Sequence, residues 1–179
     1  MLIRAFLFVL DSVAGFLCSM LLLRFLMQVL RVSFANPIGS FVVQITNWLV
    51  VPLRRVLPSV RGLDLASLLP AYLLQVLVLA ALIGLRGGLY LSLPDMLVVF
   101  LFGQAALATL RLCIYLMIGA LILQAVLSWI NPYSPFAAPV GQFTRPLLAP
   151  LRRFIPPLGM IDLSPLIALL VLQLILIFL

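Results

Sequence analysis

The feature that most constrains the fold is a series of four long apolar runs, which the chain can bury only in lipid. They lie at 5–34, 65–85, 96–130 and 162–179. A helix needs about 20 apolar residues to cross a hydrocarbon core of about 30 Å. Only 8% of the 179 residues are charged, too few to coat a soluble domain of this size. We therefore expect an all-α polytopic membrane protein with about four transmembrane helices.

The first and third runs are too long for one upright helix, because about 35 helical residues reach roughly 50 Å. Each run is either a single tilted helix or an interfacial piece followed by a spanning piece. The sequence leaves both possibilities open.

An internal duplication indicates how these runs are organised. The segment PLRRVLP at 52–58 returns as PLRRFIP at 150–156, an offset of 98 residues, and upstream pairs match at an offset of 95. Residues as rare as Cys, Asn-Pro and Asp keep the same order, which chance does not produce in a Leu-rich chain. The matched pairs are Cys18 with Cys113, Asn36-Pro37 with Asn131-Pro132, Asp64 with Asp162, and Gln75 with Gln173.

The duplication divides the chain into a first repeat at 1–87, a linker turn at 88–94 and a second repeat at 95–179. Each copy holds two spans, so both copies cross the membrane in the same direction, as parallel repeats about an axis along the membrane normal.

Seven arginines follow the first and third runs, against two or three on the opposite side. Arginine-rich loops stay on the inner side. We therefore expect the Arg-rich segments to be cytoplasmic and both termini periplasmic.

A short amphipathic segment follows each Asn-Pro pair. Proline disfavours a helical conformation in the residue before it, so Asn36 and Asn131 are expected at helix ends, with a ligand role as the less favoured alternative. In 38–51, apolar residues follow helical spacing with polar residues opposite, which predicts an interfacial or re-entrant helix. Trp48 suits the headgroup zone. The counterpart at 140–150 is expected to be more broken, because a proline interrupts it.

Two pairs of adjacent arginines stand in the expected cytoplasmic loops: Arg54 and Arg55, and Arg152 and Arg153. Anionic headgroups attract such residues by about 1 kcal/mol each. The pairs are candidate contacts for lipid or for a membrane protein partner, and topology determination alone explains them equally well. Asp64 and Asp162 precede apolar runs, where a carboxylate caps the first helical turn.

Four polar side chains are expected inside the spans: Arg24, Gln28, Gln75 and Gln173. Each of the last two follows its matched Asp by about 16 Å of helix. Such residues usually hold helices together, and lining a hydrophilic path is the alternative. Copy two has Gly119 where copy one has Arg24, so any role of Arg24 belongs to one copy.

Enzyme chemistry finds little support in this composition. The eleven basic residues are all Arg and the four acidic residues are all Asp, with no Lys, Glu or His to act as general acid or base. No metal-ligand spacing and no glycine-rich phosphate loop occur. We expect no catalysis, no cofactor and no metal. The arginines are scattered between apolar runs, so nucleic acid is not an expected partner either.

The doubled pattern Ser-aromatic-x-Asn-Pro, Thr-x-Pro, Pro-x-Arg-Arg, Asp-x-Ser-Pro and Gln resembles the YggT family, whose relatives include the YlmG proteins. The resemblance covers essentially the whole chain, with Ala66 and Ser67 departing from the family's Ser-Pro in copy one. It is clearest in copy two, at Ser128, Thr144, Pro146, Pro150, Arg152, Arg153, Pro156, Asp162, Ser164, Pro165 and Gln173. The resemblance implies the bacterial inner membrane and links to osmotic or potassium tolerance, cell division or cytochrome assembly. It supplies no family active site.

Two function classes follow. The first is a non-enzymatic scaffold or assembly factor that engages membrane lipids or an unidentified membrane protein through the Arg-Arg segments. The second is a small channel or transporter component in ion or osmotic homeostasis, with Arg24, Gln75 and Gln173 along its path. A homo-oligomer is compatible with both, because four spans are few for a self-contained pore.

Overall fold

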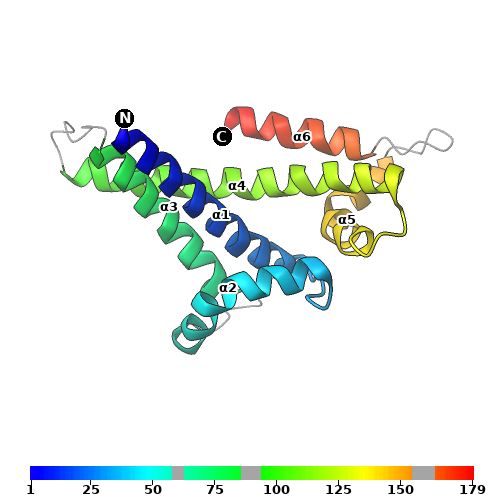
Figure 1. The fold of residues 1–179 in the computed structure, drawn as a ribbon. Helices are drawn as coiled ribbons and strands as arrows, with labels where there is room; N and C mark the ends of the chain where they lie inside the picture. Colours follow the sequence, from blue (N-terminus) through cyan, green and yellow to red (C-terminus); the bar gives the residue numbers. More distant parts are fainter. Residues whose placement is uncertain (58–62, 86–93, 155–163) are drawn as a thin grey trace.

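The computed structural model describes residues 1–57, 63–85, 94–154 and 164–179. Within these ranges the chain forms six helices and no strand (Figure 1). The helices are α1 (Leu2–Val29), α2 (Pro37–Val56), α3 (Leu65–Leu85), α4 (Pro94–Ile130), α5 (Ala137–Phe154) and α6 (Ser164–Phe178). The all-α expectation is therefore confirmed for the described part of the chain.

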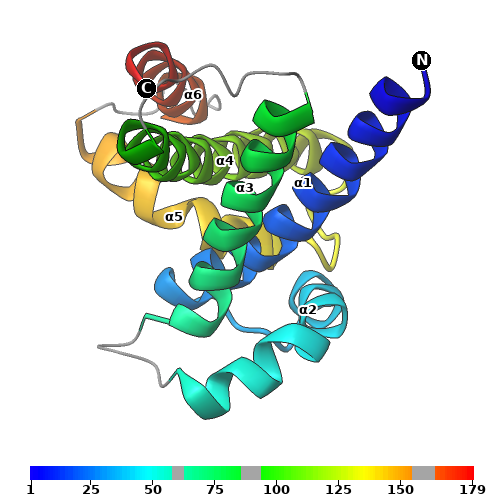
Figure 2. The ribbon, with the colours of Figure 1, turned by 90° about the vertical axis from the view of Figure 1, so that its left-hand side faces the viewer.

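The same order of helices occurs twice: a long apolar helix, an amphipathic helix and a second apolar helix. α1 packs along α3 and α4 packs along α6, so each copy is built on an apolar hairpin (Figure 1). The two hairpins cross obliquely (Figure 2), with α1 and α3 both touching α4. Each amphipathic helix lies near the end of the long helix before it, α2 beside α1 and α5 beside α4.

The number of spanning helices differs from the expected four. Three are long and apolar enough to cross a membrane: Ala5–Val29, Leu65–Gly84 and Val98–Ile130. The apolar helix Ser164–Phe178 has 15 residues, or about 23 Å, which is short of the hydrocarbon thickness. The expected fourth span at 162–179 begins outside the described residues.

The two long runs resolve differently. α4 is one continuous helix of 37 residues, about 56 Å long, so 96–130 is a single helix rather than two pieces. In the run 5–34, by contrast, the helix α1 ends at Val29, before the apolar run does. There Arg31 adopts a left-handed φ of 55°, which lets the Val32 N–H donate to the carbonyl of Met27. Val32 folds back against Met27, the apolar contact typical of such a helix end.

α2 and α5 extend further than their prolines suggested. α2 passes through Pro52, and α5 is unbroken through Pro146 and Pro150, so the expected interruption of the second amphipathic segment is wrong. All three prolines are exposed. A proline on the outer face of a helix frees a backbone carbonyl that the surroundings can satisfy, and the helix bends instead of ending. Consequently both Arg pairs occupy the last turns of helices, not loops.

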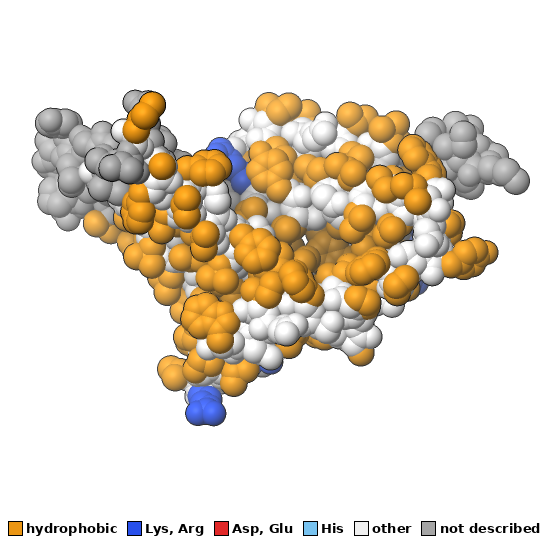
Figure 3. Space-filling model, in the orientation of Figure 1, with side chains coloured by type: hydrophobic (Ala, Val, Ile, Leu, Met, Phe, Trp, Pro, Cys, Tyr) orange, Lys and Arg blue, Asp and Glu red, His pale blue; other side chains and the backbone are white. Residues whose placement is uncertain are grey.

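Three apolar clusters hold the helices together. One joins α1, α2 and α3 around Leu21, Leu22 and Val50, and α4 packs against it. Another joins α4, α5 and α6 around Leu121 and Leu148. The third links the copies, because it brings Met27 and Val32 of copy one against Phe143 of α5. Hydrophobic side chains also cover most of the face in Figure 3, as expected of a chain whose solvent is lipid.

The start of α2 depends on a close backbone approach. Asn36 is the N-cap, and its side-chain oxygen accepts a hydrogen bond from the Gly39 N–H at 2.8 Å, while Pro37 takes the first helical position. A Cβ at Gly39 would lie 2.6 Å from both the Cα and the carbonyl oxygen of Phe34. Only glycine fits here.

We predict that Gly39→Ala lowers the free energy of unfolding by about 1–3 kcal/mol, because the added methyl group collides with backbone rather than with a mobile side chain. Gly141→Ala on α5 is the control, since a Cβ there meets nothing within 4 Å. The control is expected to be neutral or to stabilise the helix by about 0.5–1 kcal/mol. Unfolding in mixed detergent micelles measures both, and equal effects would contradict the explanation.

Candidate functional site

The most constrained polar residue of the first copy is Arg24 on α1. Its side chain is only 4% exposed. One terminal nitrogen donates to the Thr46 hydroxyl at 2.7 Å and to the Asn47 side-chain oxygen at 3.0 Å, both on α2. A charged group in an apolar surrounding is costly unless it is hydrogen-bonded. Arg24 therefore fixes the amphipathic helix α2 against the spanning helix α1.

A second set of polar contacts includes Gln28, which lies one helical turn after Arg24 on α1. Arg54, in the last turn of α2, donates to Asp64 at 2.6 Å and reaches Gln28 at 3.5 Å. The Ser67 hydroxyl donates to the same Asp64 carboxylate at 2.8 Å. Together these four residues connect the ends of α1, α2 and α3. Ser67 stands where the pattern in the second copy has proline. Its hydroxyl donates the hydrogen bond to Asp64, and a proline side chain has no group that could donate it.

Asp64 is 2% exposed and precedes the first residue of α3. Burial by itself would raise the pKa of this carboxyl group, but the hydrogen bonds from Arg54 and Ser67 and the charges of Arg54 and Arg24 outweigh it. The net result is a pKa below the ordinary value. Asp64 therefore remains a carboxylate at neutral pH and fastens Arg54 of α2 to the start of α3.

The second copy has a shorter version of this arrangement. Thr144 on α5 is fully buried and donates to the side-chain oxygen of Gln124 on α4. Thr46 and Thr144 stand at the same offset as Pro52 and Pro150, so the two threonines are equivalent. A search for charged residues does not find Thr46 and Thr144, because threonine is neutral. The signal that would have found it is a polar residue kept in both copies on the apolar face of each amphipathic helix.

The remaining expected site residues lie apart from this cluster. Gln75 is half-buried on α3 and Gln173 is exposed on α6. Trp48 is 65% exposed on α2, as a headgroup contact would require. Asn131 directly follows α4 and Pro132 lies in the turn after it. Asn36, by contrast, is the N-cap residue of α2.

Other candidate chemistry is limited. Asp162 lies outside the described residues. Arg55, Arg152 and Arg153 are exposed near the C-terminal ends of their helices, where positive charge complements the helix dipole. The Cys18 thiol donates to the Ala71 carbonyl at 3.4 Å, and neither cysteine is in a disulfide. Among the described residues, no three potential ligands from His, Cys, Asp and Glu lie together as a metal site.

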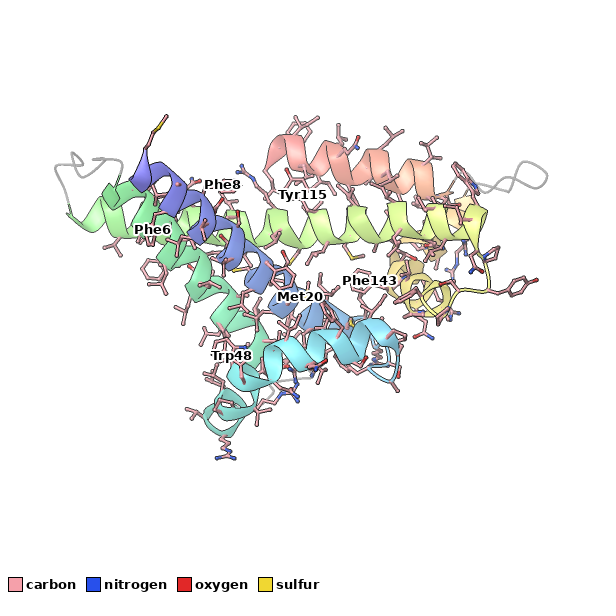
Figure 4. The ribbon with its side chains drawn as sticks, viewed as in Figure 1. Phe6, Phe8, Met20, Trp48, Tyr115 and Phe143 are labelled. Carbon is pink, nitrogen blue, oxygen red and sulfur yellow. The ribbon has the colours of Figure 1, made fainter. Side chains whose placement is uncertain are left out.

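A cavity of about 580 Å³ lies between the two copies, and none of its lining residues is charged. Figure 3 shows the hollow near the middle of the face, and Figure 4 labels Met20, Tyr115 and Phe143, which line it from α1, α4 and α5. α2 contributes Val42, one turn before Thr46, and α5 contributes Val140, one turn before Thr144. Arg24, Gln28, Gln75 and Gln173 do not line this cavity.

We predict a coupling energy of about 1.5–3 kcal/mol between Arg24 and Thr46, the range of hydrogen bonds to charged groups. Unfolding of Arg24→Met, Thr46→Val and the double variant in mixed micelles measures it. The neutral pair Gln124 and Thr144, changed to Leu and Val, is the control and should couple by about 0.6 kcal/mol. Equal coupling in the two copies would show that the charge of Arg24 is unimportant.

We predict an acid-dependent stability difference between the wild type and Asp64→Asn. Because the folded pKa of Asp64 is lowered, its contribution is present above the unfolded value of 3.8 and is lost as the pH falls through the folded pKa. The difference in unfolding midpoint should therefore shrink as the pH falls from about 5 to about 2. A difference that stays constant over this range would exclude the ionised pair as its cause.

Comparison with known proteins gives a consistent answer over nearly the whole chain. A protein of Pseudomonas aeruginosa described as uncharacterized is 37% identical over 174 residues, covering 96% of this chain and 86% of that protein. The Escherichia coli protein YggT, also described as uncharacterized, is 35% identical over 170 residues, covering 94% of this chain and 85% of its own length. No solved structure matches. The CCB3/YggT family model matches twice, at residues 3–85 and 103–179, and the chain belongs to this family.

Proposed function

We propose that this protein is a non-enzymatic scaffold or assembly factor of the bacterial inner membrane, with both Arg pairs on the cytoplasmic side. In this proposal α2 and α5 lie in the interface and present their terminal arginines to anionic headgroups and to a membrane protein partner. The observation that carries it is the repetition of one device. Each copy ends an amphipathic helix in two adjacent arginines and fastens that helix to a spanning helix through a buried threonine.

Fastening matters because a scaffold needs a fixed surface. An amphipathic helix that lies freely on a membrane can rotate and dissociate. α2 is held to α1 by Arg24 and to α3 by the pair of Arg54 with Asp64. Preorganisation of this kind lowers the entropic cost of binding a partner.

The arginines of each pair have different roles in this proposal. Arg54 is committed to Asp64, so it positions the helix end. Arg55 is exposed and is the member of the first pair that we assign to ligand contact. In the second copy we assign the same contact to the exposed Arg153.

The first experiment measures anionic lipid around α2. A Trp129→Phe variant leaves Trp48 as the single tryptophan of the chain. In mixed vesicles, brominated phosphatidylglycerol should quench Trp48 more than brominated phosphatidylcholine at the same mole fraction. Arg55→Gln should reduce this preference by up to about fivefold, the effect of about 1 kcal/mol.

Arg145→Gln is the matched control, since it removes one exposed charge from α5 and leaves both pairs intact. The proposal predicts that this variant keeps the preference reported by Trp48. Equal quenching by the two lipids in the wild type would argue against lipid engagement by the Arg pairs. Photo-crosslinkers at 55 and 153, with one at 12 as control, then test for a discrete partner protein in native membranes.

The alternative, a channel or transporter component for ions or osmotic balance, makes a separate prediction. Its path would include Arg24, Gln75 and Gln173, which line no part of the cavity described above. We expect vesicles containing the purified protein to lose potassium no faster than empty vesicles. Potassium flux that is abolished by Gln75→Leu with Gln173→Leu would favour the channel over the scaffold.

A further inference from the structure

The cavity between the copies lies beside one difference between them. Arg24 of copy one corresponds to Gly119 of copy two, and Gly119 lines the cavity. A Cβ at Gly119 would meet nothing within 4 Å. On α1 a long side chain fills the equivalent place and reaches α2. On α4 the same place is left open, and neighbouring apolar residues form the walls.

The walls specify the chemistry of an occupant. Sixteen of the seventeen lining residues are apolar or glycine, and the remaining one is Tyr115. Cavities lined in this way exclude water and accept hydrocarbon. The volume of about 580 Å³ falls within the range of about 300–1,000 Å³ typical of sites for small molecules. The spanning helices α1 and α4 supply part of the lining, and their surroundings in the membrane are acyl chains; α2 and α5 supply most of the rest.

Charge next to the cavity indicates the headgroup. Arg31 directly precedes the lining residue Val32 and is exposed. Arg31 is also the non-glycine residue with a positive φ in the described chain, a conformation that costs about 1–3 kcal/mol. Glycine would occupy this position with less strain, so the arginine brings its charge to the edge of the cavity at an energetic cost.

We propose that this cavity holds one acyl chain of an anionic membrane phospholipid, whose phosphate is contacted by Arg31. The site goes beyond the proposed function, because it uses none of the four arginines at the ends of α2 and α5. It is a specific binding site between the repeats and not a general attraction to the leaflet.

The test uses vesicles of phosphatidylethanolamine with a small fraction of photoreactive phosphatidylglycerol, which carries a diazirine in its acyl chain. We expect labelling of peptides that contain Met20, Tyr115 or Phe143 in the full-length protein. Gly119→Phe should fill the cavity and reduce this labelling about tenfold or more, equivalent to about 1.4 kcal/mol. Unchanged labelling in Gly119→Phe would overturn the proposal.

Gly103→Phe is the matched control. Gly103 lies on the same helix, also has open space around a Cβ, and does not line the cavity. It should label as the wild type does. Elution as a single species from size exclusion and an unchanged unfolding midpoint show that both variants fold. If both phenylalanines reduce labelling equally, the cavity is not the site.

Headgroup selectivity is tested separately with Arg31→Gly. Glycine suits the left-handed backbone at 31, so the variant should fold at least as well as the wild type. It should lose the preference for photoreactive phosphatidylglycerol over photoreactive phosphatidylcholine. A wild type that labels equally with both lipids refutes the anionic assignment. Dimers that disappear in Gly119→Phe, without lipid labelling in the wild type, would show instead that a second copy covers the cavity.

The result of the cavity-labelling experiment is independent of the scaffold proposal. Arg55→Gln with Arg153→Gln changes the exposed pairs and leaves the cavity untouched. Retained cavity labelling in that variant, together with loss of the quenching preference at Trp48, would support both proposals as separate sites. Loss of cavity labelling in that variant would show that the lipid is held by the helix ends, contrary to the cavity proposal.

Discussion

The structure depends on how one buried guanidinium is hydrogen-bonded in an apolar chain. Arg24 lies on a helix whose surroundings offer little hydrogen bonding, so its position is tolerable only while Thr46 and Asn47 accept from it. That requirement places α2 along α1. The pairing of Arg54 with Asp64 then sets where α3 begins. The hydrogen bonds of Arg24 would contribute little to stability in water. In hydrocarbon they determine where α2 lies, because the alternative is an unpaired charge.

Much of this architecture could be predicted from the sequence, because lipid leaves few solutions. The apolar runs predicted helices, and the duplicated Asn-Pro and Pro-Leu-Arg-Arg segments predicted the repeated order of long, amphipathic and apolar helices. The Asn-Pro pairs correctly predicted helix ends at Asn36 and Asn131, but the expected interruption of the second amphipathic segment by proline was wrong. Pro146 and Pro150 lie four residues apart on the exposed face of α5, where a freed carbonyl is not buried, so the helix continues. The inner or outer position of a proline is a tertiary property that local sequence does not reveal.

The candidate site was predictable only in its components. Arg24, Gln28, Arg54 and Asp64 were each named from the sequence, but for separate roles, and placing them together required knowing that α2 returns beside α1. Thr144 was named only as part of the Thr-x-Pro pattern, and no structural role was assigned to it or to Thr46, because a threonine side chain does not by itself indicate its partner. The cavity was beyond sequence reasoning altogether, since it is bounded by residues of four helices. Its only trace in the sequence is the exchange of arginine for glycine between copies.

That exchange has a consequence for assembly. Two identical half-length chains related by a two-fold axis must carry the same residue at both equivalent positions, so they form two buried cations or two hollows. Covalent fusion of the halves removes this restriction and lets each half mutate on its own. Of the two positions, Arg24 then joins two helices and Gly119 leaves open space. A pseudosymmetric chain of this kind gains a sidedness within the membrane plane that no strictly symmetric pair of halves can possess.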